Sequence, residues 1–350
     1  MRKTSFFMKI IIPVTIHDVA RLPKMLKALI HFGGLMDHTV IFVASPSCIL
    51  EAQNAADQLR PHCLEVMVKQ TTYEYTFGLY TDVNMLFGFT VRMLASIGNK
   101  DPFLWMEMDC RPVDFGWANS LLREYKQKGR ACLGNVVDLP RVRDGVLEPI
   151  TGDKMMMAVG IYPPGMESHE QTRPLITDLG KTPPRNPEQP FDVYMRGAIK
   201  LIGVADSVLI ADQWNTGNYR KTSEGIECES MPFPRIVRQR GGLVNKEAVL
   251  IHGCKDDSLD DILFGKAPEP KTAPVVQEAP ISEPHPVPPL PSEPYETAVL
   301  RADIQERLKK GSLRLNMLAT DYNVDNKTME KRVIEAGFII TKPALWIKAA

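Results

Sequence analysis

The run Phe103-Leu104-Trp105-Met106-Glu107-Met108-Asp109-Cys110-Arg111-Pro112 is the centre of the predicted fold. Its apolar half ends in two carboxylates, Glu107 and Asp109, one residue apart. In a β-strand, residues i and i+2 point to the same face, so we expect both carboxylates to aim at one point beyond a buried strand. Carboxylates this close repel each other, and a divalent cation that prefers oxygen ligands relieves the repulsion. A strand that simply ends in a polar loop is the alternative, but the surrounding sequence favours a cation site.

Strands and helices alternate on the N-terminal side of this run. Apolar, β-branched segments predict strands at 8–14, 39–44 and 64–68, and amphipathic patterns predict helices at 22–32, 49–59 and 82–97. This alternation is typical of a parallel sheet covered by helices, so the predicted fold class is α/β, a Rossmann-type mixed sheet with flanking helices. Ligands bind beyond the carboxyl ends of such strands, which places the loop from Pro13 to Asp18 on the same rim as Glu107 and Asp109.

The C-terminal side of the run continues the pattern. Helices are expected at 117–128 and 191–201, strands at 131–137, 154–162, 205–211 and 248–252, and a loop or hairpin at 138–152. Residues 167–190 are polar and proline-rich, which predicts a long surface loop. The residues from Asp212 to Arg220 follow a predicted strand and are dense in polar and aromatic groups.

Composition limits the classes of protein that fit. The 350 residues predict two or three domains. With 42 Lys+Arg against 42 Asp+Glu, no overall field attracts nucleic acid or membrane, although a local basic patch is compatible with that balance. Six cysteines without a C-x-x-C pair predict reduced thiols in a cytoplasmic protein, not a disulfide framework or zinc site. No apolar run reaches the roughly 18 residues of a membrane span, so no membrane partner is expected.

Three segments follow from the composition along the chain. Residues 1–265 form the predicted catalytic domain. Residues 266–294 form a flexible linker, because Pro268 to Pro294 holds ten prolines and cannot build a core. Residues 295–350 form a second module.

The second module has the pattern of a winged helix-turn-helix. An amphipathic segment at 297–309, helices at 313–322 and 326–336, and a hairpin pairing 338–340 with 345–347 give this order. Asn326, Lys327 and Lys331 are expected to face outward on the recognition helix and to bind DNA. The module carries 10 Lys+Arg and 7 Asp+Glu, a net charge of +3, which is mild for a DNA binder. Docking of a protein partner is the alternative.

A late His-Gly-x-Lys motif supplies the residues that complete a site. His252 ends an apolar strand and is followed by Gly253, Cys254 and Lys255. An imidazole at this point can complete a Mn²⁺ site, and the lysine can neutralise phosphate oxygens. A histidine that only hydrogen-bonds its neighbours is the alternative for a lone strand-end imidazole. Its position at the end of a Glu-x-Asp sheet protein favours the metal site.

In this order of motifs, residues from about Met8 to Leu263 resemble the GT-A-fold glycosyltransferases, especially the retaining kind in which a C-terminal histidine completes the metal site. The resemblance implies a GT-A-like fold and an enzyme that moves a hexosyl or pentosyl group from a nucleotide-sugar, a UDP-sugar, to a hydroxyl. It implies Mn²⁺ or Mg²⁺ on Asp109 and His252, and Lys255 on the leaving phosphate. The family's first aspartate is here Glu107, which is assigned to the metal directly, through water, or to the ribose.

The resemblance also implies donor contacts elsewhere. It places the nucleotide-sugar near Pro13, Thr15, His17, Asp18 and Trp214. Asp192 becomes a carboxylate that faces the donor sugar or acceptor, although its position at the start of a helix is also typical of an N-cap. The polar and aromatic segment from Asp212 to Arg220 is interpreted as a sugar or acceptor loop. Within it, Trp214 is equally compatible with ordinary packing.

Pairing this domain with the second module predicts the acceptor. The sharper hypothesis is a bacteriophage enzyme that glycosylates a hydroxymethylated base in DNA, in the host cytoplasm. A base inside a duplex is hidden, so such an enzyme must flip it out or act on exposed bases. The first alternative is transfer to a protein, glycan or small molecule, with the second module docking a protein. The second alternative is a non-catalytic regulator that senses a nucleotide-sugar.

Overall fold

The computed structural model describes residues 7–72, 79–143, 146–179, 190–230 and 242–265, and then the shorter ranges 304–305, 313–314, 326–335, 338–341 and 346–349. The chain divides into two compact units, Met1–Glu269 and Pro270–Ala350. The predicted linker at 266–294 lies outside the described residues, and the division at 1–265, 266–294 and 295–350 stays a prediction. No helix in the described ranges is long and apolar enough to cross a membrane.

A seven-stranded sheet forms the middle of the first unit, in the order β3-β2-β1-β4-β7-β6-β8. Its strands are β1 (Lys9–Val14), β2 (Leu35–Ala44), β3 (Cys63–Gln70), β4 (Phe103–Trp105), β6 (Cys132–Arg143), β7 (Val146–Tyr162) and β8 (Val204–Asp206). Neighbouring strands are parallel except at β7, which is antiparallel to both β4 and β6. The sheet is therefore mixed and mostly parallel.

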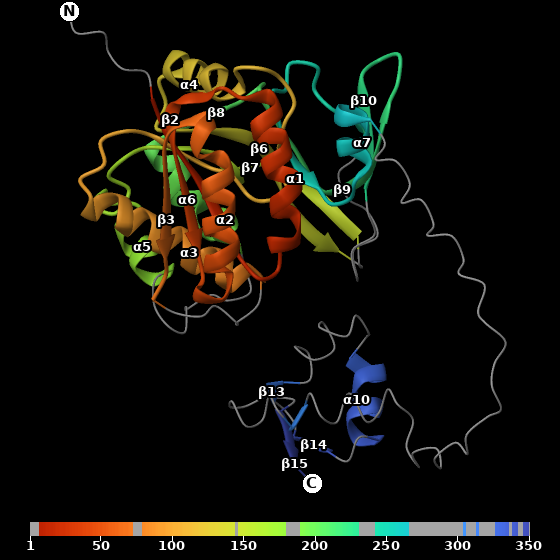
Figure 1. The fold of residues 1–350 in the computed structure, drawn as a ribbon. Coiled ribbons are helices and arrows are strands. Elements are labelled where there is room, and N and C mark those ends of the chain that lie inside the picture. The colour runs from red at the N-terminus through yellow and green to blue at the C-terminus, as the bar shows by residue number, and fades with distance from the viewer. Residues whose placement is uncertain are drawn as a thin grey trace, which may run out of the picture. The chain divides into compact units, whose positions relative to one another are not determined.

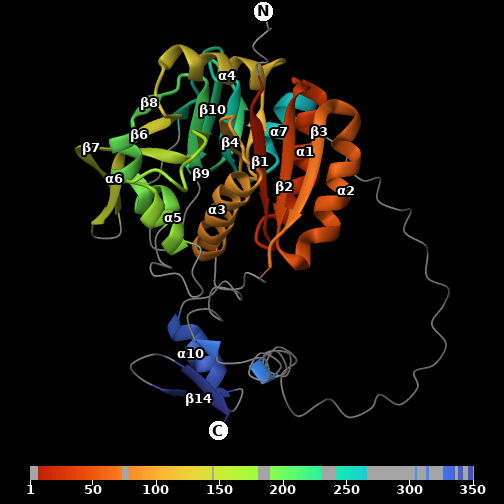
Figure 2. The ribbon, with the colours of Figure 1, turned by 90° about the vertical axis from the view of Figure 1, so that its left-hand side faces the viewer.

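Helices cover both faces of this sheet (Figures 1 and 2). One face holds α1 (Leu22–Phe32), α2 (Ile49–Leu59) and α4 (Trp117–Lys128), and the other holds α3 (Leu79–Ser96), α5 (Arg173–Leu179) and α6 (Phe191–Ile202). Ile10 and Ile12 of β1 pack in the first core, whereas Ile11 packs in the second. A strand covered on both faces is apolar at every buried position, which explains the unbroken apolar sequence of β1 from Ile10 to Val14. The predicted α/β fold class, a Rossmann-type mixed sheet with flanking helices, is confirmed.

Short 3-10 helices precede or follow several of these elements. They are η1 (Val19–Arg21), η2 (Pro46–Cys48) and η3 (Arg60–His62). The first of them follows the end of β1, so the chain turns tightly there before α1 begins.

A second sheet, in the order β11-β10-β9-β12-β5, completes the unit. Its strands are β5 (Arg111–Pro112), β9 (Ile210–Lys221), β10 (Ile226–Ser230), β11 (Gly242–Leu243) and β12 (Leu250–Cys254), and α7 (Ser258–Phe264) follows β12. β12 runs parallel to β9 and antiparallel to β5. Figure 1 shows β9, β10 and α7 grouped beside α1. Because β5 comes directly after Cys110, the second sheet joins the Glu-x-Asp segment to the strand of His252.

Two predictions about the connections are wrong. The strand expected at 205–211 is two strands, β8 and β9, which belong to different sheets. Glu124 of α4 separates them, because it accepts hydrogen bonds from Ser207 Oγ at 2.5 Å and from the Val208 amide at 3.0 Å and holds a turn there. The loop expected at 167–190 contains α5, which forms because Ile176 and Leu179 are buried in the core with α3. The hairpin alternative for 138–152 is confirmed by the pairing of β6 with β7.

The described part of the second unit contains a small sheet and one helix. The sheet has the order β13-β15-β14, with β13 (Leu313–Arg314), β14 (Phe338–Thr341) and β15 (Trp346–Ala349), and the helix is α10 (Asn326–Glu335). The predicted hairpin and the helix from Asn326 are confirmed. The helix expected at 313–322 is wrong at its first two residues, which pair with β15 as β13. Residues 315–325 lie outside the described ranges, so the winged helix-turn-helix stays a prediction.

Candidate active site

The three side chains predicted as metal ligands lie together. Glu107, Asp109 and His252 each offer one ligand atom, and these atoms all lie within 4.8 Å of one another. His252 Nε2 is 3.2 Å from Asp109 Oδ1 and 3.3 Å from Glu107 Oε2. Asp109 and His252 are buried, whereas Glu107 is partly exposed. The structure thus brings together Glu107 and His252, which are 145 positions apart in the sequence.

The two carboxylates reach this point from a turn and not from a strand face. β4 ends at Trp105, and the last ladder bond runs from the Met106 amide to the Ile11 carbonyl at 2.9 Å. The Cys110 amide then donates to the Glu107 carbonyl at 3.0 Å and closes a turn. The expectation that Glu107 and Asp109 share a strand face is therefore wrong, because the chain leaves the first sheet here to enter the second as β5.

A backbone bond fixes Asp109 to the strand that carries His252. The Cys254 amide of β12 donates to the Asp109 carbonyl at 3.0 Å. β12 also pairs with β5, two residues beyond Asp109. The relative positions of Asp109 and His252 are therefore set by main-chain hydrogen bonds on both sides.

A buried carboxylate holds the far side of the His252 ring. His252 Nδ1 is 2.8 Å from Asp212 Oδ2, and the parallel register of β12 and β9 places the two residues opposite each other. Histidines that bind metals typically donate their other ring N–H to such a carboxylate, which fixes the ring. His252 Nε2 is buried and satisfies no hydrogen bond among the described residues. An orphaned nitrogen between two carboxylate oxygens fits Mn²⁺ or Mg²⁺.

Charges within the site balance one another. Burial alone would lower the pKa of His252, but the Asp212 and Asp109 carboxylates raise that pKa well above its ordinary value. Burial opposes ionisation of Asp109, yet Lys255 and His252 hold the pKa of Asp109 well below its usual range. The Nε2 side of the His252 ring, which faces Asp109 and Glu107, is thus the position where a cation would bind.

Lys255 joins the group from the segment after β12. Its Nζ donates to Asp109 Oδ2. The other carboxylate oxygen, Oδ1, is the one nearer to His252. Burial would lower the pKa of Lys255, but the Asp109 carboxylate raises it above its ordinary value. Lys255 thus lies beside the predicted metal ligands, where its ammonium forms an ion pair with Asp109.

The loop after β1 contributes Asp18 and Thr15 to the same rim. Burial and the charge of Asp109 raise the pKa of Asp18, while Arg21, which forms an ion pair with Asp18, lowers it. Thr15 is buried, and its Oγ1 has no hydrogen-bond partner among the described residues. Asp18 is thus close enough to interact with Asp109, as expected of a loop at the carboxyl edge.

Two other predicted nucleotide contacts have structural partners of their own. Pro13 is buried within β1 and pairs with Val43 of β2. His17 is exposed, and its Nε2 is 2.9 Å from Oδ2 of Asp82, a fully buried carboxylate on α3. Contacts of these residues with a nucleotide stay predictions.

Asp192 lies at the beginning of α6 but is not its N-cap. Pro190 is the N-cap, and Asp192 is the second helical residue, where its Oδ1 accepts from the Val193 amide at 2.9 Å. Burial raises the pKa of Asp192 to about 7, and the charge of Glu107 adds to the rise. The Asp192 carboxyl therefore lies close enough to Glu107 for the two charges to interact.

Trp214 does not lie in a loop. It falls within β9, and its side chain is outside the described part of the structure. The predicted sugar or acceptor loop from Asp212 to Arg220 is therefore wrong as a loop, because the segment continues the β9 strand.

The sequence did not identify Arg111 or Asp260 as part of the site. The guanidinium of Arg111 is buried and holds both oxygens of Asp260 on α7, at 2.9 and 3.2 Å. Its Nη1 also donates to the carbonyls of Met108, at 3.2 Å, and Cys110, at 2.8 Å. These carbonyls lie on either side of Asp109. The available signal was an arginine directly after the carboxylates and before a proline.

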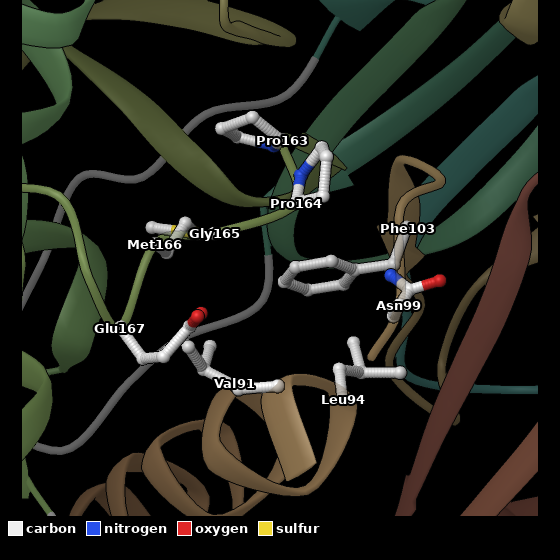
Figure 3. A pocket seen from close by; sticks show the side chains of 10 residues that line it. Val91, Leu94, Asn99, Phe103, Pro163, Pro164, Gly165, Met166 and Glu167 are labelled. Atoms are coloured by element: carbon white, nitrogen blue, oxygen red, sulfur yellow. The ribbon is translucent and has the colours of Figure 1, made fainter. Parts of the chain in front are cut away.

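A small pocket lies at the opposite edge of the sheet (Figure 3). It is bounded by the end of α3, the beginning of β4 at Phe103, and the segment Pro163-Pro164-Gly165 after β7. It contains none of the predicted site residues. The chemistry-bearing side chains thus gather at the carboxyl edge, as is usual for α/β sheets.

Comparisons with known proteins give a distant likeness. No family model matches the sequence, and no curated protein does. Among solved structures, the WbbM bifunctional glycosyltransferase is 9% identical, with 61% of this chain and 41% of that chain covered and a TM-score of 0.42. A 4-diphosphocytidyl-2C-methyl-D-erythritol synthase is 14% identical, with 55% and 98% covered and a TM-score of 0.30. The chain spans about two fifths of the first protein's length. Sequence identities this low indicate nothing about the reaction, which is therefore inferred from the site.

Proposed function

We propose that the protein is a metal-dependent glycosyltransferase that moves a sugar from a nucleotide-sugar to a hydroxyl acceptor. One observation carries the proposal: His252 Nε2, held from behind by Asp212, points between Asp109 and Glu107 without a hydrogen bond among the described residues. Glu107, Asp109 and His252 would hold Mn²⁺ or Mg²⁺. When bound, the ion supplies positive charge that stabilises a departing diphosphate.

The other side chains suit the same reaction. Transfer breaks the bond between the anomeric carbon and the donor phosphate, and a new bond forms to the acceptor oxygen. Lys255, adjacent to Asp109, can neutralise the phosphate oxygens that gain charge. The acceptor hydroxyl loses its proton, and Asp192, with a pKa of about 7, is suited to receive it. Asp18 and Thr15 lie where the loop after β1 can contact the nucleotide.

A screen of cations and donors tests this function. The full chain is heated with Mn²⁺, Mg²⁺ or EDTA, alone and with UDP-, GDP-, CDP- and dTDP-sugars. We expect one donor to raise the melting temperature only when a cation is present, because a ligand that binds the folded state stabilises it by mass action. Stabilisation by a donor in EDTA, or by none in any condition, contradicts the proposal. Donor binding without sugar transfer or hydrolysis supports the nucleotide-sugar-sensing regulator instead.

For the acceptor, we propose a hydroxymethylated base in DNA, from the pairing of this site with a second unit that carries an exposed Lys331 on α10. The side chains of Asn326 and Lys327 lie outside the described part of the structure. Lys331→Glu is expected to weaken duplex DNA binding by the full chain and to reduce the dependence of log K on log salt by about one. Unchanged affinity and salt dependence support the alternative, a protein-docking module with a protein, glycan or small-molecule acceptor.

A further inference from the structure

Each oxygen of the Asp109 carboxylate faces a nitrogen of a basic side chain. Oδ1 faces His252 Nε2 at 3.2 Å, and Oδ2 accepts a hydrogen bond from Lys255 Nζ. A dication placed on the ligand atoms of Glu107, Asp109 and His252 would share this carboxylate with the Lys255 ammonium. Positive charges that share one buried carboxylate repel each other strongly, because little water screens them.

The backbone around Lys255 is fixed, but its side chain has space to move. On one side, the Cys254 amide donates to the Asp109 carbonyl at 3.0 Å. On the other, the Asp256 carboxylate accepts from the Ser258 amide at 3.1 Å and from the Asn218 amide at 2.7 Å. The Lys255 side chain is 24% exposed, whereas that of Asp109 is 4% exposed. A change in Lys255 rotamers therefore moves the ammonium outward while the carboxylate and the backbone stay in place.

The identity of the residue suits such an exchange. An ammonium on a four-carbon stem is a compact charge with rotatable donors, whereas a guanidinium holds a carboxylate with a rigid, two-pronged geometry. The same site shows the contrast, since Arg111 holds Asp260 through two nitrogens and is 1% exposed. The lysine at 255 makes one contact to Asp109 and can leave it.

We propose that Lys255 is an exchangeable internal cation, which occupies Asp109 until a divalent cation binds and then turns to the diphosphate of the nucleotide. This inference rests on the proposed function. It deepens that function by giving the order of binding, with the divalent cation before the nucleotide.

Lys255→Met distinguishes this role from a structural one, because it is expected to change the affinity for Mn²⁺ and the affinity for the nucleoside diphosphate in opposite directions. Removal of a competing charge next to the site tightens Mn²⁺ binding by about tenfold. With Mn²⁺ saturating, loss of the ammonium weakens binding of the nucleoside diphosphate by about tenfold. If Lys255 only supported the fold, its substitution would weaken both affinities or change neither of them.

The measurement is isothermal titration of the full chain, first with Mn²⁺ and then, in Mn²⁺, with whichever of UDP, GDP, CDP or dTDP the unaltered protein binds most tightly. Lys24→Met is the matched control, because Lys24 pairs with the exposed Asp257 nearby on α7's N-terminal side and has no contact with Asp109. Its affinities should change less than twofold. A melting curve in EDTA checks folding, and Lys255→Gln, which keeps a neutral donor, replaces Lys255→Met if that variant does not fold.

Each result has a distinct meaning. If the unaltered protein binds no Mn²⁺, the proposed function is wrong. If it binds Mn²⁺ but the Lys255 variant binds the ion no more tightly, only the exchange is overturned. Tighter Mn²⁺ binding with unchanged diphosphate binding also overturns the exchange, since Lys255 then does not turn to the phosphate. Opposite changes in the two affinities support it.

Discussion

Asp109→Asn is expected to lower the affinity for Mn²⁺ by about a thousandfold and to abolish sugar transfer. Asp109 is buried, and both of its oxygens face cationic groups, so the neutral amide removes the centre of the site's charge balance. Removing one partner of a buried interaction between charges costs about 3 to 5 kcal/mol. A loss of about 4 kcal/mol corresponds to about a thousandfold in affinity, at 1.4 kcal/mol for each factor of ten.

Titration with Mn²⁺ and a transfer assay with the donor found in the thermal screen measure this effect. Asp212→Asn is the graded comparison, because Asp212 contacts the far nitrogen of His252 and not the ligand atoms. Loss of such an orienting carboxylate typically weakens metal binding by about 10- to 100-fold. The expected order of Mn²⁺ affinity is therefore unaltered protein, Asp212→Asn, Asp109→Asn. Transfer at the normal rate by Asp109→Asn would rule out the metal-dependent mechanism.

The sheet could be predicted from the sequence because its central strands are covered on both faces. β1 is apolar at every position from Ile10 to Val14, and each neighbouring helix shows one apolar stripe, so strand and helix periods separate clearly. Ser207 illustrates what could not be predicted. It interrupts an apolar segment because Glu124, 83 positions earlier, accepts its hydroxyl. Contacts between distant residues override local propensity, and no local pattern records them.

The site residues that belong to short sequence motifs could be predicted. Glu107, Asp109 and Lys255 lie just beyond strand ends, His252 lies two residues before the end of β12, and the carboxyl edge of the sheets brings them together. Asp212 was less visible, because only the register between β9 and β12 reveals that it faces His252. The roles of all these side chains toward metal and nucleotide stay predictions.

Arg111→Met is expected to destabilise the first unit by about 3 kcal/mol and to weaken Mn²⁺ binding. Removing one partner of a buried ion pair costs about 3 to 5 kcal/mol, because the other charge stays buried without compensation. The Asp260 side chain is 13% exposed, so the lower end of that range applies. The melting temperature should fall by roughly 6 to 12 °C, at about 2 to 4 °C per kcal/mol for a domain of this size.

The comparison variant is Asp101→Asn. It breaks the Lys9–Asp101 pair, whose side chains are more exposed and which joins the amino ends of β1 and β4, away from the site. Surface pairs contribute about 0 to 1 kcal/mol, so a small change in melting temperature and no change in Mn²⁺ affinity are expected. If the two variants destabilised the protein equally, Arg111 would contribute no more to stability than a more exposed ion pair does.

Removing both charges distinguishes the stabilising role of Arg111 from its role in the site. Apolar replacement of a whole buried ion pair is often neutral for stability, so Arg111→Met combined with Asp260→Leu should regain most of the lost melting temperature. The carbonyls of Met108 and Cys110 would still lack the donors that Arg111 Nη1 supplies on either side of Asp109. Mn²⁺ affinity should therefore stay low in the double variant. Recovery of both properties together would show that Arg111 acts on the site only through overall stability, whereas recovery of stability alone identifies it as the residue that holds the Asp109 turn in its metal-binding shape.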